Sequence, residues 1–193
     1  MFAKLAKNMA CFCVKNNFIK KEDEEIFEDG MEFLLSAVSN LFAAVLIAVL
    51  TDSLIPCLIE LTTFATMRIF AGGYHANTHI GCMITLILVQ VLFVTIIKMV
   101  SIGTLKTITP YMMIISVYLI VILTPVAHPD KPLPDNLIYK LPKKAYILTA
   151  IWTAFSLTFL LLDISYISFC SAYGMVFVSG AMVADVIRLR MEK

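Results

Sequence analysis

The chain carries long runs of apolar residues without a charged side chain. A helix that crosses a hydrocarbon core about 30 Å thick needs roughly 20 such residues. Runs that approach this length are Phe33–Thr51, Ile80–Ile97, Thr107–Ala127, Ala145–Leu162 and Ile164–Ala184. A shorter run, Ser53–Met67, is interrupted by Glu60. These runs predict an all-α polytopic integral membrane protein with about six transmembrane helices, one of which is short or re-entrant.

Composition and patterning exclude the other broad classes of fold. Hydrophobic residues make up 60% of the chain and charged residues 15%, whereas about a quarter of a typical soluble domain is charged. A soluble fold of this size exposes too much surface to hide so many apolar side chains. The sequence shows neither recurring strict alternation nor an internal repeat, which argues against a β-barrel and an inverted-repeat transporter. A net charge of +1 favours no nucleic-acid partner.

The basic residues predict how the spans are oriented. With six spans, every lysine and arginine except Lys98 and Lys106 falls on one side of the membrane. Basic residues resist translocation, so both termini are expected in the cytoplasm. We divide the chain into an N-terminal cytoplasmic segment (1–29), a transmembrane domain (30–187) and a short cytoplasmic tail (188–193).

The N-terminal segment has the pattern of an amphipathic helix. At the helical period, Phe2, Leu5, Met9 and Phe12 share one face, and lysines lie on the opposite face. Such a helix lies in the plane of the membrane interface rather than crossing it. We therefore expect the lipid bilayer to bind this segment as well as the six spans.

The segment RIFAGGYHANTHIGC, from Arg68 to Cys82, concentrates the residue types that carry chemistry. It joins the second and third spans on the predicted cytoplasmic side. Gly72 and Gly73 permit backbone conformations closed to other residues and so end the preceding helix. Thr78, or the asparagine before it, is a suitable N-cap for the third span. Cys82 then lies near the first turn of that helix, where the helix dipole favours a thiolate.

His75 and Cys82 form a candidate catalytic pair. They are seven residues apart, which places them on one face of a continuous helix, or places His75 in the turn beside the helix start. A cysteine nucleophile with a histidine base is the minimum set for thiol catalysis. Two other interpretations remain open. In one, the cysteine and histidine are ordinary packing and hydrogen-bonding residues. In the other, His75, His79 and Cys82 bind zinc, although no clear fourth ligand lies nearby. We expect no metal and no other cofactor.

The same segment resembles the accessory gene regulator B family. The matching pattern, R-x-F-A-G-G-Y-H-A-x-T-x-x-x-C, runs from Arg68 to Cys82 between two apolar spans. The loop PVAHPDKPLPD, from Pro125 to Asp135, and the tripeptide Gly30–Glu32 resemble two further family positions. Chain length, number of spans and the basic N-terminus also agree, so the resemblance covers most of the chain.

The resemblance implies a cysteine endopeptidase of bacterial quorum sensing, a multi-pass protein of the cell membrane that acts as a homodimer. Such proteins cut the C-terminal part from a small precursor peptide of the accessory gene regulator D type. They then promote closure of the remaining segment into a thiolactone or lactone ring. Carried over by position, Cys82 is the nucleophile and His75 its base. The residues Arg68, Gly73 and Glu32 match positions linked to activity in the family.

Several residues are expected to support this chemistry. A backbone N–H at the start of the third span, or near Gly72 and Gly73, could stabilise an oxyanion. Glu32 either orients His75 or is a solvated carboxylate at a helix start. Glu60 lies eight residues before Arg68, roughly on the same helical face. It therefore either pairs with Arg68 or faces a water-filled cavity.

The proline-rich loop that precedes the fifth span also carries lysines. Lys140, Lys143 and Lys144 either bind the acidic C-terminal tail found in precursors of this family, or only retain the loop on the cytoplasmic side. Two other functions compete with the peptidase. A small membrane exporter of a peptide would not require Cys82, and a scaffold without chemistry would require neither Cys82 nor His75.

Overall fold

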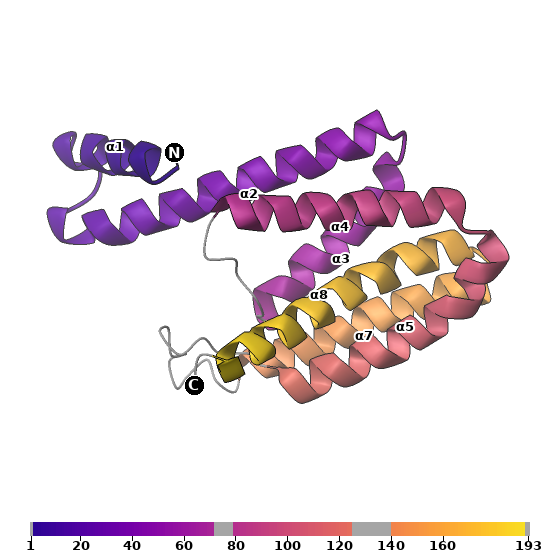
Figure 1. Ribbon diagram of the computed structural model, residues 1–193. Coiled ribbons are helices and arrows are strands. Elements are labelled where there is room, and N and C mark those ends of the chain that lie inside the picture. Colours follow the sequence, from indigo (N-terminus) through magenta and orange to yellow (C-terminus); the bar gives the residue numbers. More distant parts are fainter. Residues whose placement is uncertain (1, 72–78, 125–139, 192–193) are drawn as a thin grey trace.

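The structure, a computed structural model, describes residues 2–71, 79–124 and 140–191, without the side chains of residues 79, 140 and 141. This part of the chain is helical and contains six helices long and apolar enough to cross a membrane. They are α2 (Glu24–Leu50), α3 (Leu54–Ala71), α4 (His79–Met99), α5 (Ile102–Leu123), α7 (Lys140–Leu161) and α8 (Ser165–Met191) (Figure 1). The predicted all-α polytopic fold is confirmed. The run interrupted by Glu60 forms α3, a helix of 18 residues.

The N-terminal amphipathic segment forms α1 (Phe2–Lys15), which is followed by a short 3-10 helix (Lys21–Asp23) and lies against the first part of α2 (Figure 1). Its buried residues are the small Ala6 and Ala10, whereas the larger Leu5, Met9 and Phe12 are exposed. The helix therefore packs on α2 through alanines and keeps its bulky apolar side chains free, as an interfacial helix requires.

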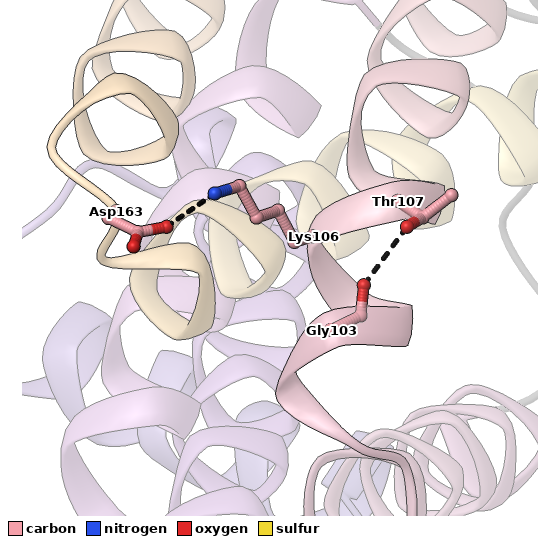
Figure 2. A network of polar contacts seen from close by, with 4 residues as sticks. All are labelled: Gly103, Lys106, Thr107 and Asp163. Atoms are coloured by element: carbon pink, nitrogen blue, oxygen red, sulfur yellow. Dashed lines mark hydrogen bonds and ion pairs between the residues drawn. The ribbon is translucent and has the colours of Figure 1, made fainter.

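Tight turns connect the helices at the end of the molecule remote from Arg68. Asp52 and Asp163 adopt left-handed conformations, with φ of 49° and 63°, immediately after α2 and α7. At the start of α5, the Oγ atom of Ser101 accepts a hydrogen bond from the backbone N–H of Thr104. Figure 2 shows the ion pair of 2.6 Å between Lys106 Nζ and Asp163 Oδ1, which joins α5 to the turn between α7 and α8.

Helix α8 is the centre of the bundle. It packs against α3, α5 and α7, and Figure 1 shows these four helices gathered together. Many of its buried residues are small: Ser165, Ser168, Cys170, Ser171, Ala172, Gly174 and Ser179. Small residues let transmembrane helices approach closely, which is how they associate in a solvent as apolar as their own side chains. A Cβ atom at Gly174 would lie 2.8 Å from the carbonyl oxygen of Glu60, so α3 and α8 touch there through backbone.

Helices α2 and α4 lie side by side outside this bundle (Figure 1). The buried side chains of α4 are all in its second half, namely Gln90, Phe93, Val94 and Ile97. There Phe93 stacks on Phe169 of α8, with ring centroids 6.4 Å apart, and contacts Tyr173. From Ile80 to Val89 no side chain of α4 is buried. Helix α4 is thus anchored to the bundle at one end, the end opposite Cys82.

Candidate active site

Cys82 is the fourth residue of α4, as the expected N-cap position predicts. Its side chain is half-buried, and its Sγ atom accepts a hydrogen bond of 3.6 Å from Nδ2 of Asn40 on α2. The first turn of a helix presents unpaired backbone N–H groups and the positive end of the helix dipole. The Asn40 amide and the start of α4 therefore both place partial positive charge at the end of the helix that carries Cys82.

The face of α2 that carries Asn40 also carries Glu32. The intervening Ser36 is buried, and the spacing of four residues places all three side chains on one face of the helix. Glu32 is half-buried and lies eight residues before Asn40, or about 12 Å along the helix axis. This face of α2 therefore leads from Cys82 toward the end of α4 that receives the chain from residues 72–78.

Arg68 lies in the last turn of α3. Its guanidinium group is close enough for charge–charge interactions with both Cys82 of α4 and Asp185 of α8. Asp185 is 3% exposed, and its Oδ1 atom has no hydrogen-bond partner in the described part of the chain. The end of α3 is fixed on α8 by apolar packing of Met67 and Ala71 against Val178, Met182 and their neighbours. A single arginine thus connects the bundle to the cysteine.

The structure does not bear on the other half of the predicted pair. His75, Gly72 and Gly73 lie outside the described residues, as does the side chain of His79, so the zinc alternative also lies largely outside them. The chain runs through residues 72–78 from Ala71, three residues after Arg68, to His79, three residues before Cys82.

Glu60 does not belong to this group of residues. Its side chain is 1% exposed in the interior of the helices, and neither carboxyl oxygen has a hydrogen-bond partner in the described part of the chain. The ion pair with Arg68 considered from the sequence is therefore not formed. The other cysteines of the spans, Cys57 and Cys170, are fully buried and pack in the apolar core.

The lysines at the start of α7 lie at the same end of the molecule as Arg68. Lys143 and Lys144 are exposed, and the Lys144 ammonium lies 5.4 Å from the ring centroid of Phe70 on α3. The side chain of Lys140 lies outside the described residues. Apolar packing of Ala145 and Trp152 against the end of α3 keeps this part of α7 in place.

Two residues of this neighbourhood were not found from the sequence. Asn40 is 42 residues from Cys82 and is an isolated amide in an apolar run, so no local pattern marks it. Asp185 has Arg188 one helical turn away, so the sequence by itself favours a pair within the last span over an interaction with Arg68. The only sequence signal for Asp185 was a carboxylate inside an apolar span, which is costly unless it serves a purpose.

Comparison with known proteins identifies one family. The family model described as Accessory gene regulator B matches residues 4–182 of the chain. No curated protein and no solved structure gives a significant match. The matched residues include most of α1, all of α2 to α7, and most of α8.

Proposed function

The chain belongs to the accessory gene regulator B family, and from this premise we propose that it is a cysteine endopeptidase that cleaves a precursor peptide and promotes its cyclisation. Family membership gives it a role in processing an autoinducing peptide for quorum sensing, together with an accessory gene regulator D propeptide. The observation that carries the enzymatic proposal is the position of Cys82, half-buried at a helix start, hydrogen-bonded by Asn40 and within range of the charge of Arg68.

In the first step, the Cys82 sulfur attacks the carbonyl carbon at the cut site, and His75 takes the thiol proton. The carbon–nitrogen bond then breaks, and His75 gives the proton to the departing amine. The C-terminal fragment leaves, and the N-terminal part remains on Cys82 as a thioester. The Asn40 amide and the Arg68 guanidinium favour this step because both stabilise negative charge near the sulfur.

In the second step, a thiol or hydroxyl group within the bound peptide attacks the thioester carbonyl. The new bond closes a thiolactone or lactone ring, and the Cys82 sulfur leaves and recovers a proton. A thioester is already activated, so the exchange needs no ATP. Water would give a linear peptide instead, and the half-buried position of Cys82 near the membrane-embedded part of α4 limits its access.

The remaining residues have supporting roles in this proposal. Glu32 orients His75 from the face of α2 that leads away from Cys82, and the backbone near Gly72 and Gly73 contributes to an oxyanion site. Lys140, Lys143 and Lys144 bind the acidic tail of the precursor from the start of α7.

We also propose how the whole protein is arranged in the membrane. Residues 30–187 form the peptidase domain, and segments 1–29 and 188–193 are cytoplasmic. The protein acts as a homodimer in the bacterial cell membrane. This orientation brings the Arg68 end of the bundle to the side where a newly made precursor arrives.

The proposed function is tested by co-expression with a precursor peptide and mass spectrometry of the peptide products. We expect the wild-type protein to shorten the precursor and Cys82→Ser to lose this activity by about a thousandfold or more. The matched controls are Cys57→Ser and Cys170→Ser, which alter buried cysteines in the same spans. Normal cleavage by Cys82→Ser, or no cleavage by the wild-type protein, would contradict the proposal.

A further inference from the structure

Glu60 on α3 and Gln90 on α4 form a polar pair in the interior of the transmembrane region. Each side chain is 1% exposed. The two side chains are close to each other, but within the described part of the chain neither carboxyl oxygen of Glu60 nor Nε2 of Gln90 has a hydrogen-bond partner. Glu60 lies in the interior of α3, and Gln90 lies near the middle of α4. Both groups are therefore far from the aqueous ends of their helices.

The groups around this pair offer no compensating positive charge. From its own helix, Glu60 is close to Cys57, and from α8 it is close to Cys170 and Tyr173. The hydroxyl group of Tyr173 donates to the backbone oxygen of Val89, so it is already engaged. Gln90 is the polar neighbour from α4. No cationic group contributes in the part of the chain that the structure describes.

An ionised carboxylate without a partner is very costly in an apolar interior, and the usual response of the group is to take up a proton. A neutral carboxylic acid has an O–H donor as well as an acceptor. An amide can accept from the O–H and donate to the carbonyl oxygen. Small rotations of the two side chains therefore satisfy the polar atoms of both, which an ionised Glu60 cannot do as completely.

We propose that Glu60 is a buried proton-binding site, in which a neutral carboxyl group hydrogen-bonds to Gln90 and couples α4 to the bundle. Gln90 is the first buried side chain of α4 after the long unburied stretch that contains Cys82. The pair thus lies at the boundary between the free and the anchored half of this helix. Loss of the proton would place an uncompensated charge at this boundary and weaken the attachment of α4.

The site has a consequence for catalysis that rests on the proposed function. Cys82 lies eight residues before Gln90, about 12 Å along the same helix. A change in how α4 meets α3 therefore changes the position of Cys82 relative to Arg68, which lies on α3. The existence of the proton site does not depend on this consequence and can be measured without a peptide substrate.

The first experiment is infrared spectroscopy of the purified full-length protein in lipid. A protonated carboxyl group has a carbonyl stretch that ionised carboxylates lack. We expect this band near neutral pH in the wild-type protein and in Glu25→Gln, an exposed control on α2, and its loss in Glu60→Gln. A wild-type spectrum without this band, or a Glu60→Gln spectrum that retains it, would overturn the proposal.

The second experiment measures melting temperature as a function of pH. Glutamine mimics the neutral acid, so Glu60→Gln should melt within about 2 °C of the wild type at neutral pH, while Glu60→Ala should melt lower by more than that. Only the folded state holds this proton, so raising the pH should destabilise the wild type more than Glu60→Gln. Equal destabilisation by Glu60→Gln and Glu60→Ala would show that the fold requires an ionised carboxylate. Identical pH profiles for the wild type and Glu60→Gln would show that the stability does not depend on a proton at Glu60.

Peptide cleavage gives a separate test of the coupling. Glu60→Gln should cleave a precursor within about threefold of the wild type, whereas Gln90→Leu, which removes the partner amide, should cleave more slowly than that. A protein that never cleaves a precursor would contradict the proposed function and leave the infrared and melting results valid. A normal rate in Gln90→Leu, with wild-type cleavage intact, would contradict the coupling to Cys82.

Discussion

The bundle of α3, α5, α7 and α8 differs from the pair of α2 and α4, although all six helices are long and apolar enough to cross a membrane. In the bundle, α8 is surrounded and buries thirteen residues, many of them small. In the pair, α2 buries only Ser36, Ala44 and Ala48, and no described side chain of α4 is buried before Gln90. Similar hydrophobicity therefore produces two different kinds of packing.

The difference separates the scaffold from the proposed nucleophile. Arg68 and Asp185 lie on the tightly packed helices, whereas Cys82 and Asn40 lie on the loosely packed pair. Regions with few buried contacts open at lower free-energy cost than a packed core. A site at the junction of the two parts can keep its charged groups fixed while the cysteine adjusts to a peptide. Variants of the two parts should therefore differ in their effects on stability and on peptide cleavage.

The largest effect is expected from filling the contact between α3 and α8. A Cβ atom at Gly174 would lie 2.8 Å from the Glu60 carbonyl oxygen and 2.9 Å from the Cβ atom of Thr63. Gly174→Leu should therefore destabilise the bundle by about 3 kcal/mol or more, which thermal unfolding would record as a drop of roughly 6 °C or more. The control is Gly180→Leu on the same helix, where no atom lies within 4 Å of the added Cβ. Equal stability of the two variants would show that α8 does not control the packing.

The second largest effect is expected from Asp185, the buried carboxylate of α8 that interacts with Arg68. Asp185→Asn removes a carboxylate that interacts with Arg68 through charge, so the position of the guanidinium relative to Cys82 should change. We expect cleavage to fall about tenfold, equivalent to about 1.4 kcal/mol, and Asp185→Glu to restore part of it. Asp163→Asn, at the exposed opposite end, is the control. A rate equal to that of the wild type would mean that Asp185 does not position Arg68.

A smaller effect is expected at the rim of the bundle. The ion pair of Lys106 and Asp163 has a short contact, but the two side chains are 53% and 76% exposed (Figure 2). Exposed ion pairs contribute about 0–1 kcal/mol, so Lys106→Met should lower the melting temperature by no more than about 3 °C. A larger loss would show that the rim, rather than the small residues of α8, holds the bundle together.

The smallest effect is expected on α1, beside the loosely packed pair. Cys11 donates a hydrogen bond of 3.3 Å to Glu24, and this bond and the carboxylate charge raise the pKa of the Cys11 thiol. Glu24→Gln should lower that pKa, so alkylation of Cys11 at mildly alkaline pH should become faster, by about twofold. Mass spectrometry of the labelled protein measures the rate. An unchanged rate would indicate that α1 is not held against α2 through this contact.

The sequence was sufficient to predict the spans because their length and charge are set by the bilayer itself. The six helices and the amphipathic α1 follow from residues that are neighbours in the chain. The different packing of the spans could not be predicted in the same way. The hydropathy of α4 is as high as that of any other span, yet half of it is not buried, because burial depends on which helices meet it.

The candidate site was predictable to the extent that it is local. Arg68 and Cys82 belong to one motif, and the start of α4 at His79 agrees with the expected helix start. Asn40 and Asp185 reach the site only through the packing of α2 and α8. Asn40 lies 42 residues before Cys82 in the sequence, and Asp185 lies 117 residues after Arg68. The spacing of eight residues predicts that Glu60 either pairs with Arg68 or faces a water-filled cavity, whereas its side chain lies close to Gln90 of a different helix.

The central claim is that Cys82 carries the peptide as a thioester. It is tested most directly by rapid acid quenching of the protein with a precursor peptide, followed by digestion and mass spectrometry. The expected result is the mass of the N-terminal peptide segment on Cys82, which hydroxylamine removes and Cys82→Ala lacks. Cleaved peptide without an adduct on Cys82, or an adduct on another cysteine, would contradict the account.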